Sequence, residues 1–145
     1  MRVMVLVKAD KDSEAGMLPS TELLTAMGQY NEELVKAGVM LAGEGLHASS
    51  KGKRIRFAGG KTSVIDGPFA ETKELVAGFW LWQVKSMEEA VEWARRMPNP
   101  QNADGDWVEI RPVFETEEFA PNDPTGQVRE AEHRLRAQIE AQAKH

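Results

Sequence analysis

Two side chains in this sequence are candidates for proton transfer because of where they lie. Asp66 begins the turn Asp66-Gly67-Pro68-Phe69, where its carboxylate could act as a general base or could bond its own downstream backbone as a turn residue. His47 is the only histidine in the first 114 residues and could carry a proton, unless it is a surface imidazole. We therefore take Asp66 and His47 as the candidate catalytic residues.

Five further residues are candidates for ligand binding. Glu44 lies three positions before His47, so the two side chains point to different faces of a regular strand. Trp80 and Trp82 share one face of a strand, where they either pack in the core or form a flat wall for a planar molecule. Arg54 and Arg56 belong to a basic run that either attracts an anionic ligand or is simply solvated. That run is Lys51, Lys53, Arg54, Arg56 and Lys61.

The composition excludes several classes of site. With 145 residues, no cysteine and three histidines, the chain cannot form disulfides, iron–sulfur clusters, cysteine-rich zinc sites or a cysteine nucleophile. We predict no metal site, because zinc needs three or four converging ligands. Glycine-rich phosphate-binding loops and the nucleophile elbow of serine hydrolases are absent, so we predict no cofactor.

Charge and hydropathy also limit the partners. A net charge of −5 and a basic run without interleaved aromatic residues argue against direct nucleic-acid binding. No segment approaches the roughly 18 apolar residues of a membrane helix. We therefore expect a cytoplasmic protein without a membrane partner.

The elements that must position these residues can be predicted from periodicity and turn signals. Alternating or double-sided apolar runs predict strands, and three- and four-residue apolar spacing predicts helices. A Gly59-Gly60 turn predicts a hairpin, and Ser86 with Glu89 predicts a capping box. The predicted strands are 1–9, 39–46, 53–58, 61–65, 78–84 and 107–114, and the helices run from Ser20 or Thr21 to Gly38 and from Ser86 to Pro98 and Pro100.

This order of elements indicates an α+β, ferredoxin-like βαββαβ fold with an inserted β-hairpin. Both helices cover one face of the sheet, and apolar strands on its other face suggest that a second subunit covers them. We predict a domain over residues 1–114 and an extension over 115–145 with one helix at about 126–142. The domain has a charge of −2 (14 basic, 16 acidic residues) and the extension −3 (4 basic, 7 acidic).

The nine residues Asp66-Gly67-Pro68-Phe69-Ala70-Glu71-Thr72-Lys73-Glu74 resemble the signature of YCII-related proteins, in the branch named after its DGPF motif. The flanking segments support the resemblance over about residues 1–114. These are Tyr30-Asn31-Glu32-Glu33-Leu34, Lys36-Ala37-Gly38, Ala42-Gly43-Glu44-Gly45-Leu46 and Gly78-Phe79-Trp80, in the order of that family. The resemblance implies a homodimeric α+β barrel, in which two ferredoxin-like sheets face each other.

The resemblance implies two alternative functions. The resemblance implies enzymatic activity in at least one member of the narrower YCII branch, a dehydrochlorinase with a His–Asp pair, but this chain has Ala26-Met27 and Asn99 in the two corresponding regions. We expect a small-molecule-binding homodimer, or a cofactor-free enzyme of isomerase or lyase type, with a cleft near Asp66, Glu44 and His47. The alternative is a regulatory module that binds an extracytoplasmic-function sigma factor.

Overall fold

The computed structural model describes residues 1–99 and 106–143. The chain divides into two compact units, Met1–Pro112 and Val113–His145, which are described separately below. The first unit contains the sheet, the helices that cover it and the hairpin. The second contains the C-terminal helix.

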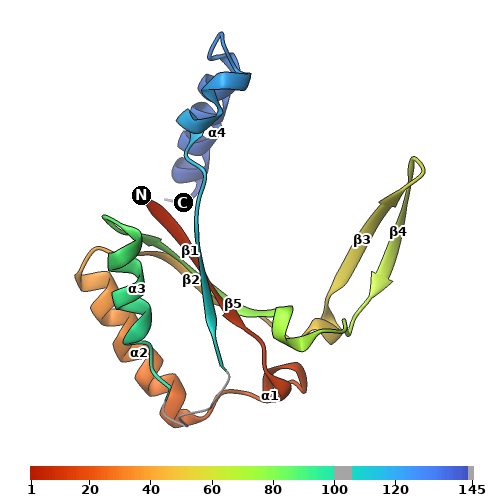
Figure 1. The fold of residues 1–145 in the computed structure, drawn as a ribbon, viewed down its shortest axis with the longest axis vertical. Coiled ribbons are helices and arrows are strands. Elements are labelled where there is room, and N and C mark those ends of the chain that lie inside the picture. Colours follow the sequence, from red (N-terminus) through yellow and green to blue (C-terminus); the bar gives the residue numbers. More distant parts are fainter. Residues whose placement is uncertain (100–105, 144–145) are drawn as a thin grey trace. The chain divides into compact units, whose positions relative to one another are not determined.

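The first unit is built on a four-stranded antiparallel sheet (Figure 1). Its strands are β1 (Arg2–Lys8), β2 (Met40–Gly45), β5 (Val76–Gln83) and β6 (Val108–Pro112), in the order β2-β5-β1-β6. The first strand therefore lies in the middle, and β6 is an edge strand that ends at Pro112, where a missing amide hydrogen costs no ladder bond. This order and the all-antiparallel pairing confirm the predicted ferredoxin-like α+β fold.

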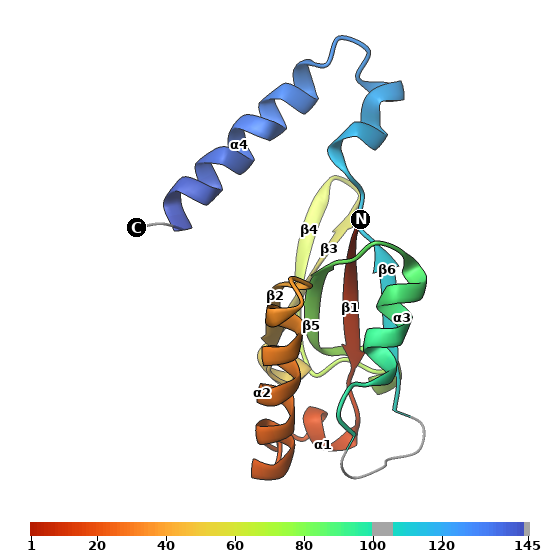
Figure 2. The ribbon, with the colours of Figure 1, turned by 90° about the vertical axis from the view of Figure 1, so that its left-hand side faces the viewer.

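Two helices cover one face of the sheet (Figure 2). Helix α2 (Thr21–Lys36) begins where the Ser20 side chain accepts a hydrogen bond from the Leu23 amide, and Gly38 follows it with a φ of +73°. Helix α3 (Met87–Arg95) begins at Ser86, which accepts from the Glu89 amide. The Glu89 carboxylate accepts from the Lys85 amide, one residue earlier than the predicted capping box requires.

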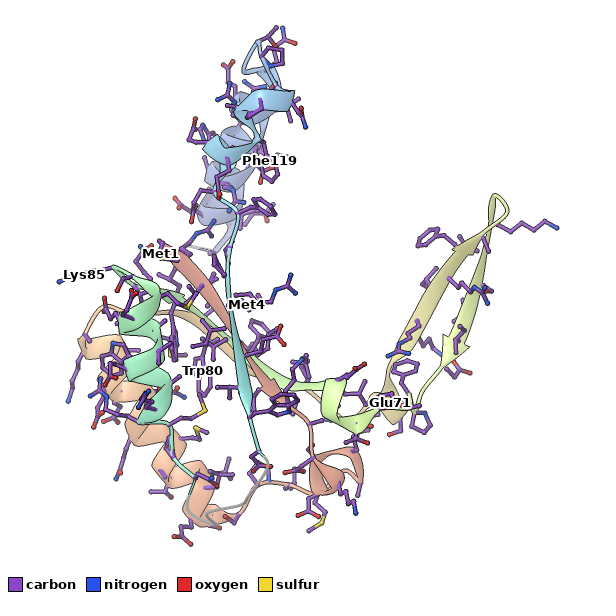
Figure 3. The ribbon with its side chains drawn as sticks, in the orientation of Figure 1. Met1, Met4, Glu71, Trp80, Lys85 and Phe119 are labelled. Carbon is purple, nitrogen blue, oxygen red and sulfur yellow. The ribbon has the colours of Figure 1, made fainter. Side chains whose placement is uncertain are left out.

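The core lies between this face and the helices. Val3 and Val5 of β1 and Trp82 of β5 are fully buried there, and Leu34 of α2 packs against them. Register places Val5 opposite Trp80, and Met4 opposite Leu81 on the other face of the sheet. Figure 3 accordingly shows Trp80 on the helix side and Met4 on the opposite side.

A two-stranded hairpin is inserted between β2 and β5. It consists of β3 (Lys53–Ala58) and β4 (Lys61–Asp66), joined by Gly59 and Gly60 with positive φ, as predicted. Every residue of both strands is exposed. The two views agree that the hairpin lies on the side of the sheet away from the helices (Figures 1 and 2).

Short helical segments were not predicted from the sequence. Helix α1 (Lys11–Glu14) lies in the predicted polar loop, with the Asp10 and Ser13 side chains capping each other's backbone. The 3-10 turns η1 (Ser49–Lys51) and η2 (Thr72–Glu74) flank the hairpin. Segments this short have no apolar periodicity from which to recognise them. Pro100, one of the predicted helix stops, lies outside the described residues.

The second unit contains the 3-10 segment η3 (Thr116–Asn122) and helix α4 (Gln127–Ala143). The carboxylate of Asp123, four residues before α4, accepts hydrogen bonds from the amides of Val128 and Arg129 in the first turn of the helix. The helix is close to the predicted span. In the described part of the chain, no helix combines the length and apolar character needed to cross a membrane.

Candidate functional site

A cavity of about 550 Å³ opens at one end of the helix layer of the first unit. Its lining is mostly apolar, and it comes from segments far apart in the sequence. The lining residues are Val7, Lys8, Asp10, Ser13, Gly16, Met17, Leu18, Pro19, Leu23, Met27, Gly45, Leu46, His47, Ala48, Ala77, Ala94, Met97, Pro98, Asn99, Asp106, Trp107 and Val108.

The loop between β1 and α2 forms one wall of this cavity. Asp10 caps α1 by accepting from the Ser13 amide at 2.8 Å, which holds the loop in a compact turn. Met17 and Leu18 then follow with 61% and 88% of their surface exposed. An apolar pair this exposed indicates a surface available for contact with another molecule.

A hydrogen-bonded network attaches this loop to the turn at residues 66–69. The Glu14 carboxylate accepts from both the amide and the hydroxyl of Ser49, at 3.0 and 2.5 Å. The Ser49 hydroxyl oxygen in turn accepts from the Phe69 amide at 3.0 Å. One serine therefore joins α1, η1 and the turn, directly beside Ala48 of the cavity lining.

Four ionisable side chains line the cavity, and two of them are already engaged. Lys8 forms an ion pair with Glu109 at 3.5 Å, and Asp10 caps α1. His47 and Asp106 form no hydrogen bond or ion pair with any other described residue. An imidazole and a carboxylate in one apolar cavity could bind a polar group of a ligand or move a proton. Within residues 1–99 and 106–143, no three metal-ligating side chains are grouped together.

Only one of the two residues predicted as catalytic lines the cavity. His47 lines the cavity, whereas Asp66 lies outside its lining at the base of the hairpin. The Asp66 carboxylate is 2.5 Å from the Lys53 ammonium group across the two strands, and the side chain is 74% exposed. Its partner is therefore a hairpin residue directly opposite in register.

The predicted ligand-binding residues also lie apart from the cavity lining. Glu44 is opposite Phe79, on the sheet face away from the helices, so it does not share a face with the core indoles. Trp80 and Trp82 are 7% and 0% exposed in the core, and the Trp80 indole donates to the Asn31 side chain at 2.9 Å. Both indoles therefore pack in the core, which was one of the two alternatives for this pair, and do not form a wall of the cavity.

The two arginines point from one face of the exposed hairpin. Arg54 is opposite Ile65 and Arg56 is opposite Ser63. The Arg54 guanidinium stacks over the Phe69 ring at 3.9 Å, so part of its function is to hold the base of the hairpin.

The two glycines of β2 have different surroundings. A Cβ atom at Gly43 would lie 2.7 Å from the Trp80 ring, so the close neighbour there is the protein's own core. At Gly45, which lines the cavity, a Cβ would meet nothing within 4 Å.

Most of the cavity lining was missed from the sequence. The lining is dominated by residues such as Leu23, Met97 and Trp107, which look like ordinary core or strand residues when read by periodicity alone. The apolar pair Met17-Leu18 in an otherwise polar loop was the signal that could have indicated it.

Two other lining residues occupy informative positions. Met27 and Asn99 lie in the two regions where the sequence resemblance implied a His–Asp pair, and both line this cavity. The cavity therefore coincides with the place where the resemblance would put the chemistry, although neither residue can transfer a proton there.

Comparison with known proteins identifies the family of this chain. Residues 1–119 match the YCII-related domain. An uncharacterised protein of Rhizobium meliloti (strain 1021) is 38% identical to this chain over 87 residues, which cover 60% of this chain and 69% of the relative. Because the domain match spans most of the chain, this protein belongs to the YCII-related family.

Proposed function

We propose that this protein binds a small, largely apolar molecule in the cavity between α2, α3 and the loop of residues 10–19, and that it does so as a homodimer. The observation that carries the proposal is the cavity itself. Its volume of about 550 Å³ lies within the range of small-molecule sites. An apolar lining with a few polar groups is also typical of such sites.

The polar groups of the lining suggest which molecule fits. Lys8 is held by Glu109, so the cavity offers no free cation among its described residues that would favour a strongly anionic ligand. His47 and Asp106 instead suit a ligand with one or two hydroxyl, carbonyl or amine groups. We infer a planar or aliphatic body against Leu23, Met27 and Trp107.

Cofactor-free acid–base chemistry would depend on His47 rather than on Asp66. Histidine changes its charge between pH 5 and 8, so it is suited to proton transfer at neutral pH. Asp66 lies outside the lining, and its carboxylate is paired with Lys53. The reactions compatible with one imidazole and no cofactor are isomerisation and elimination, in which a proton leaves carbon and returns to carbon or departs with a leaving group.

The homodimer is supported by the open face of the sheet. Met4, Leu6, Phe79 and Leu81 form an apolar strip there, and no helix of the first unit lies on it (Figures 1 and 2). Apolar surface of this kind is expected to be covered by another molecule.

The binding proposal is tested with the chain's own methionines. In NMR spectra of methyl-labelled methionine, a library of small aromatic and aliphatic alcohols and ketones is screened for shifted resonances. We expect hits to shift Met17, Met27 and Met97, which line the cavity, and to leave Met4 on the open sheet face unchanged. Hits that shift only Met4, or no hits at all, would contradict the proposal.

A blocking variant sharpens this test. Ala48→Trp adds a large ring to the lining and should weaken binding of each hit at least tenfold. Gln29→Trp adds the same ring to an exposed position on α2 outside the lining and should have no effect. His47→Gln should weaken those hits that carry a hydrogen-bonding group and leave purely apolar hits unchanged.

A second candidate function is a regulatory module that binds an extracytoplasmic-function sigma factor. It is supported by the apolar stripe of α4, where Val128, Leu135 and Ile139 are 69%, 54% and 62% exposed. If this function holds, the chain should retain a purified sigma factor of the same organism, and a chain lacking residues 121–145 should not. Retention of the sigma factor by neither chain would contradict it.

A further inference from the structure

The β3–β4 hairpin (residues 53–66, here called the arm) is stable only if something covers it. A two-stranded hairpin alone is marginally stable in water. All of its strand residues are exposed, and Phe57, Val64 and Ile55 are 79%, 60% and 51% exposed. Burying these three side chains on another surface would supply the missing stabilisation.

The strand register shows that the two faces of the arm differ in composition. Ile55 is opposite Val64 and Phe57 is opposite Thr62, so these residues form one continuous apolar face. The Lys53–Asp66 ion pair lies at the base of this face, and the other face carries Arg54, Arg56 and Lys61 together with Ile65. Only the first face has the composition of a buried contact.

The base of the arm is held to the body of the unit. Gly67 donates its amide hydrogen to the Gly52 carbonyl at 3.0 Å, and Arg54 stacks on Phe69. Phe69 is bonded in turn to Ser49. The arm is therefore attached firmly at one end and exposed along its whole length, which suits a segment that reaches another molecule.

Charge indicates what that molecule is. The arm contains four basic residues and one acidic residue, a net charge of +3. The rest of the chain contains 14 basic and 22 acidic residues, a net charge of −8. The rest of a second copy of this chain therefore carries a net charge opposite to that of the arm, which favours their association.

The position of the arm points to the same partner. The arm and the open strip of Met4, Leu6, Phe79 and Leu81 lie on the same side of the sheet, opposite the helices (Figures 1 and 2). A second copy that packs on the strip would extend toward the arm. We propose that the arm is a clasp, whose apolar face of Ile55, Phe57 and Val64 docks on the second copy in the homodimer.

This inference rests on the proposed homodimer and is tested by the dimer dissociation constant, measured by sedimentation of the full chain. Phe57→Ser should raise that constant at least tenfold, because Phe57 is exposed in a single chain and buried in the clasp. Leu24→Ser, which removes a 58% exposed side chain from α2, should leave it within twofold. Circular dichroism of both variants checks that the fold is retained.

A second measurement uses the absence of cysteine. Single cysteines at Thr62 and Ser63 place an environment-sensitive fluorophore on the apolar and the basic face of the arm, one residue apart. On dilution through dimer dissociation, the Thr62 label should move to a more polar environment and the Ser63 label should change less. Equal responses at the two sites would overturn the proposal.

The two proposals can fail separately. A chain that remains monomeric at millimolar concentration overturns both the homodimer and the clasp. A dimer whose dissociation constant is unchanged by Phe57→Ser overturns the clasp alone. Arg56→Glu with Lys61→Glu should weaken the dimer in low salt and have little effect in high salt, because the charge attraction is screened there.

Discussion

The backbone of Gly67 lies against the carbonyl oxygen of Ser49, so closely that a Cβ atom at position 67 would be 1.7 Å from that oxygen. No L-amino acid other than glycine fits this contact without a backbone shift. The same Ser49 bonds Glu14 and Phe69 through its side chain. The glycine of the turn at residues 66–69 therefore serves the packing that joins the arm, η1 and the cavity wall.

Gly67→Ala should destabilise the first unit by about 3 kcal/mol, since overpacking against backbone cannot be relieved by a side-chain rotation. Chemical unfolding followed by tryptophan fluorescence measures this loss. Gly28→Ala is the matched control, because a Cβ at that exposed position of α2 meets nothing within 4 Å. We expect the control to be more stable than the wild type by about 0.5–1 kcal/mol. Equal stabilities of the two variants would contradict the assignment.

Ser49→Ala should loosen the attachment of the loop of residues 10–19 to the turn. The change removes the hydroxyl donor to Glu14 and the acceptor for the Phe69 amide, while the Ser49 amide still bonds Glu14, so we expect a loss of about 1–2 kcal/mol. Hydrogen exchange should become faster at the amides of Ser13 and Phe69, with Ser50→Ala as the control for an exposed neighbouring serine. Unchanged exchange at both amides would show that the network does not hold the loop.

The fold was predictable because its signals are local and repeated. Val3 and Val5 alternate with Met4 and Leu6, and Gly59-Gly60 can only be a tight turn between the two flanking strands. The same pattern indicated that the sheet has two apolar faces while both helices lie on one. These features depend on residues within a few positions of each other, which a single sequence reveals directly.

The candidate site was less predictable because its residues meet only through the tertiary fold. His47 and Asp106 lie far apart in the sequence, and the rest of the cavity that both of them line consists mostly of side chains of ordinary core type. The partner of Asp66 depends on the register of β3 and β4, which places Lys53 directly opposite. Turn chemistry explained an aspartate at position 66 equally well, so the sequence could not distinguish the two.

The hydrogen bonds of Asp123 predict that acid loosens the start of α4 in the second unit. Backbone hydrogen bonding from Arg129, followed by the Val128 amide and the Arg129 guanidinium, holds the pKa of this carboxyl below its ordinary 3.8, against the opposing effect of burial. A lowered pKa in the folded state means that its stabilisation is present above pH 3.8 and is lost as the pH falls through the folded value. The start of α4 should therefore loosen only in strong acid.

NMR chemical shifts of the Val128 and Arg129 amides follow this transition residue by residue. In Asp123→Asn the side chain can still accept a hydrogen bond, but it no longer titrates. We expect both amides to titrate together below pH 3.8 in the wild type and to remain constant in the variant. A midpoint above the ordinary value would reverse the sign of the argument.

The buried hydroxyl of Tyr30 predicts that the free energy of unfolding of the first unit falls in alkali. Its hydroxyl donates to the Trp93 carbonyl oxygen at 2.5 Å and joins α2 to α3. Burial raises the pKa of Tyr30 to about 12, with Glu33 adding to the rise and Arg96 opposing it. Because the folded state holds the phenolic proton more tightly than the unfolded state, this stabilisation is complete below pH 10 and is lost as the pH rises toward 12.

This tyrosine is the only one in the chain, so its ionisation is visible by ultraviolet absorbance without interference from another phenol. Between pH 10 and 12 the wild type should lose on the order of 2 kcal/mol more than Tyr30→Phe, which has no phenolic proton to release. Below pH 10 the variant should be the less stable protein by about 1 kcal/mol, because it lacks the bond to Trp93. The two curves of unfolding free energy against pH should therefore cross between pH 10 and 12, since the other side chains are the same in both proteins. Parallel curves across that range would mean that the phenol of Tyr30 is not what links α2 to α3.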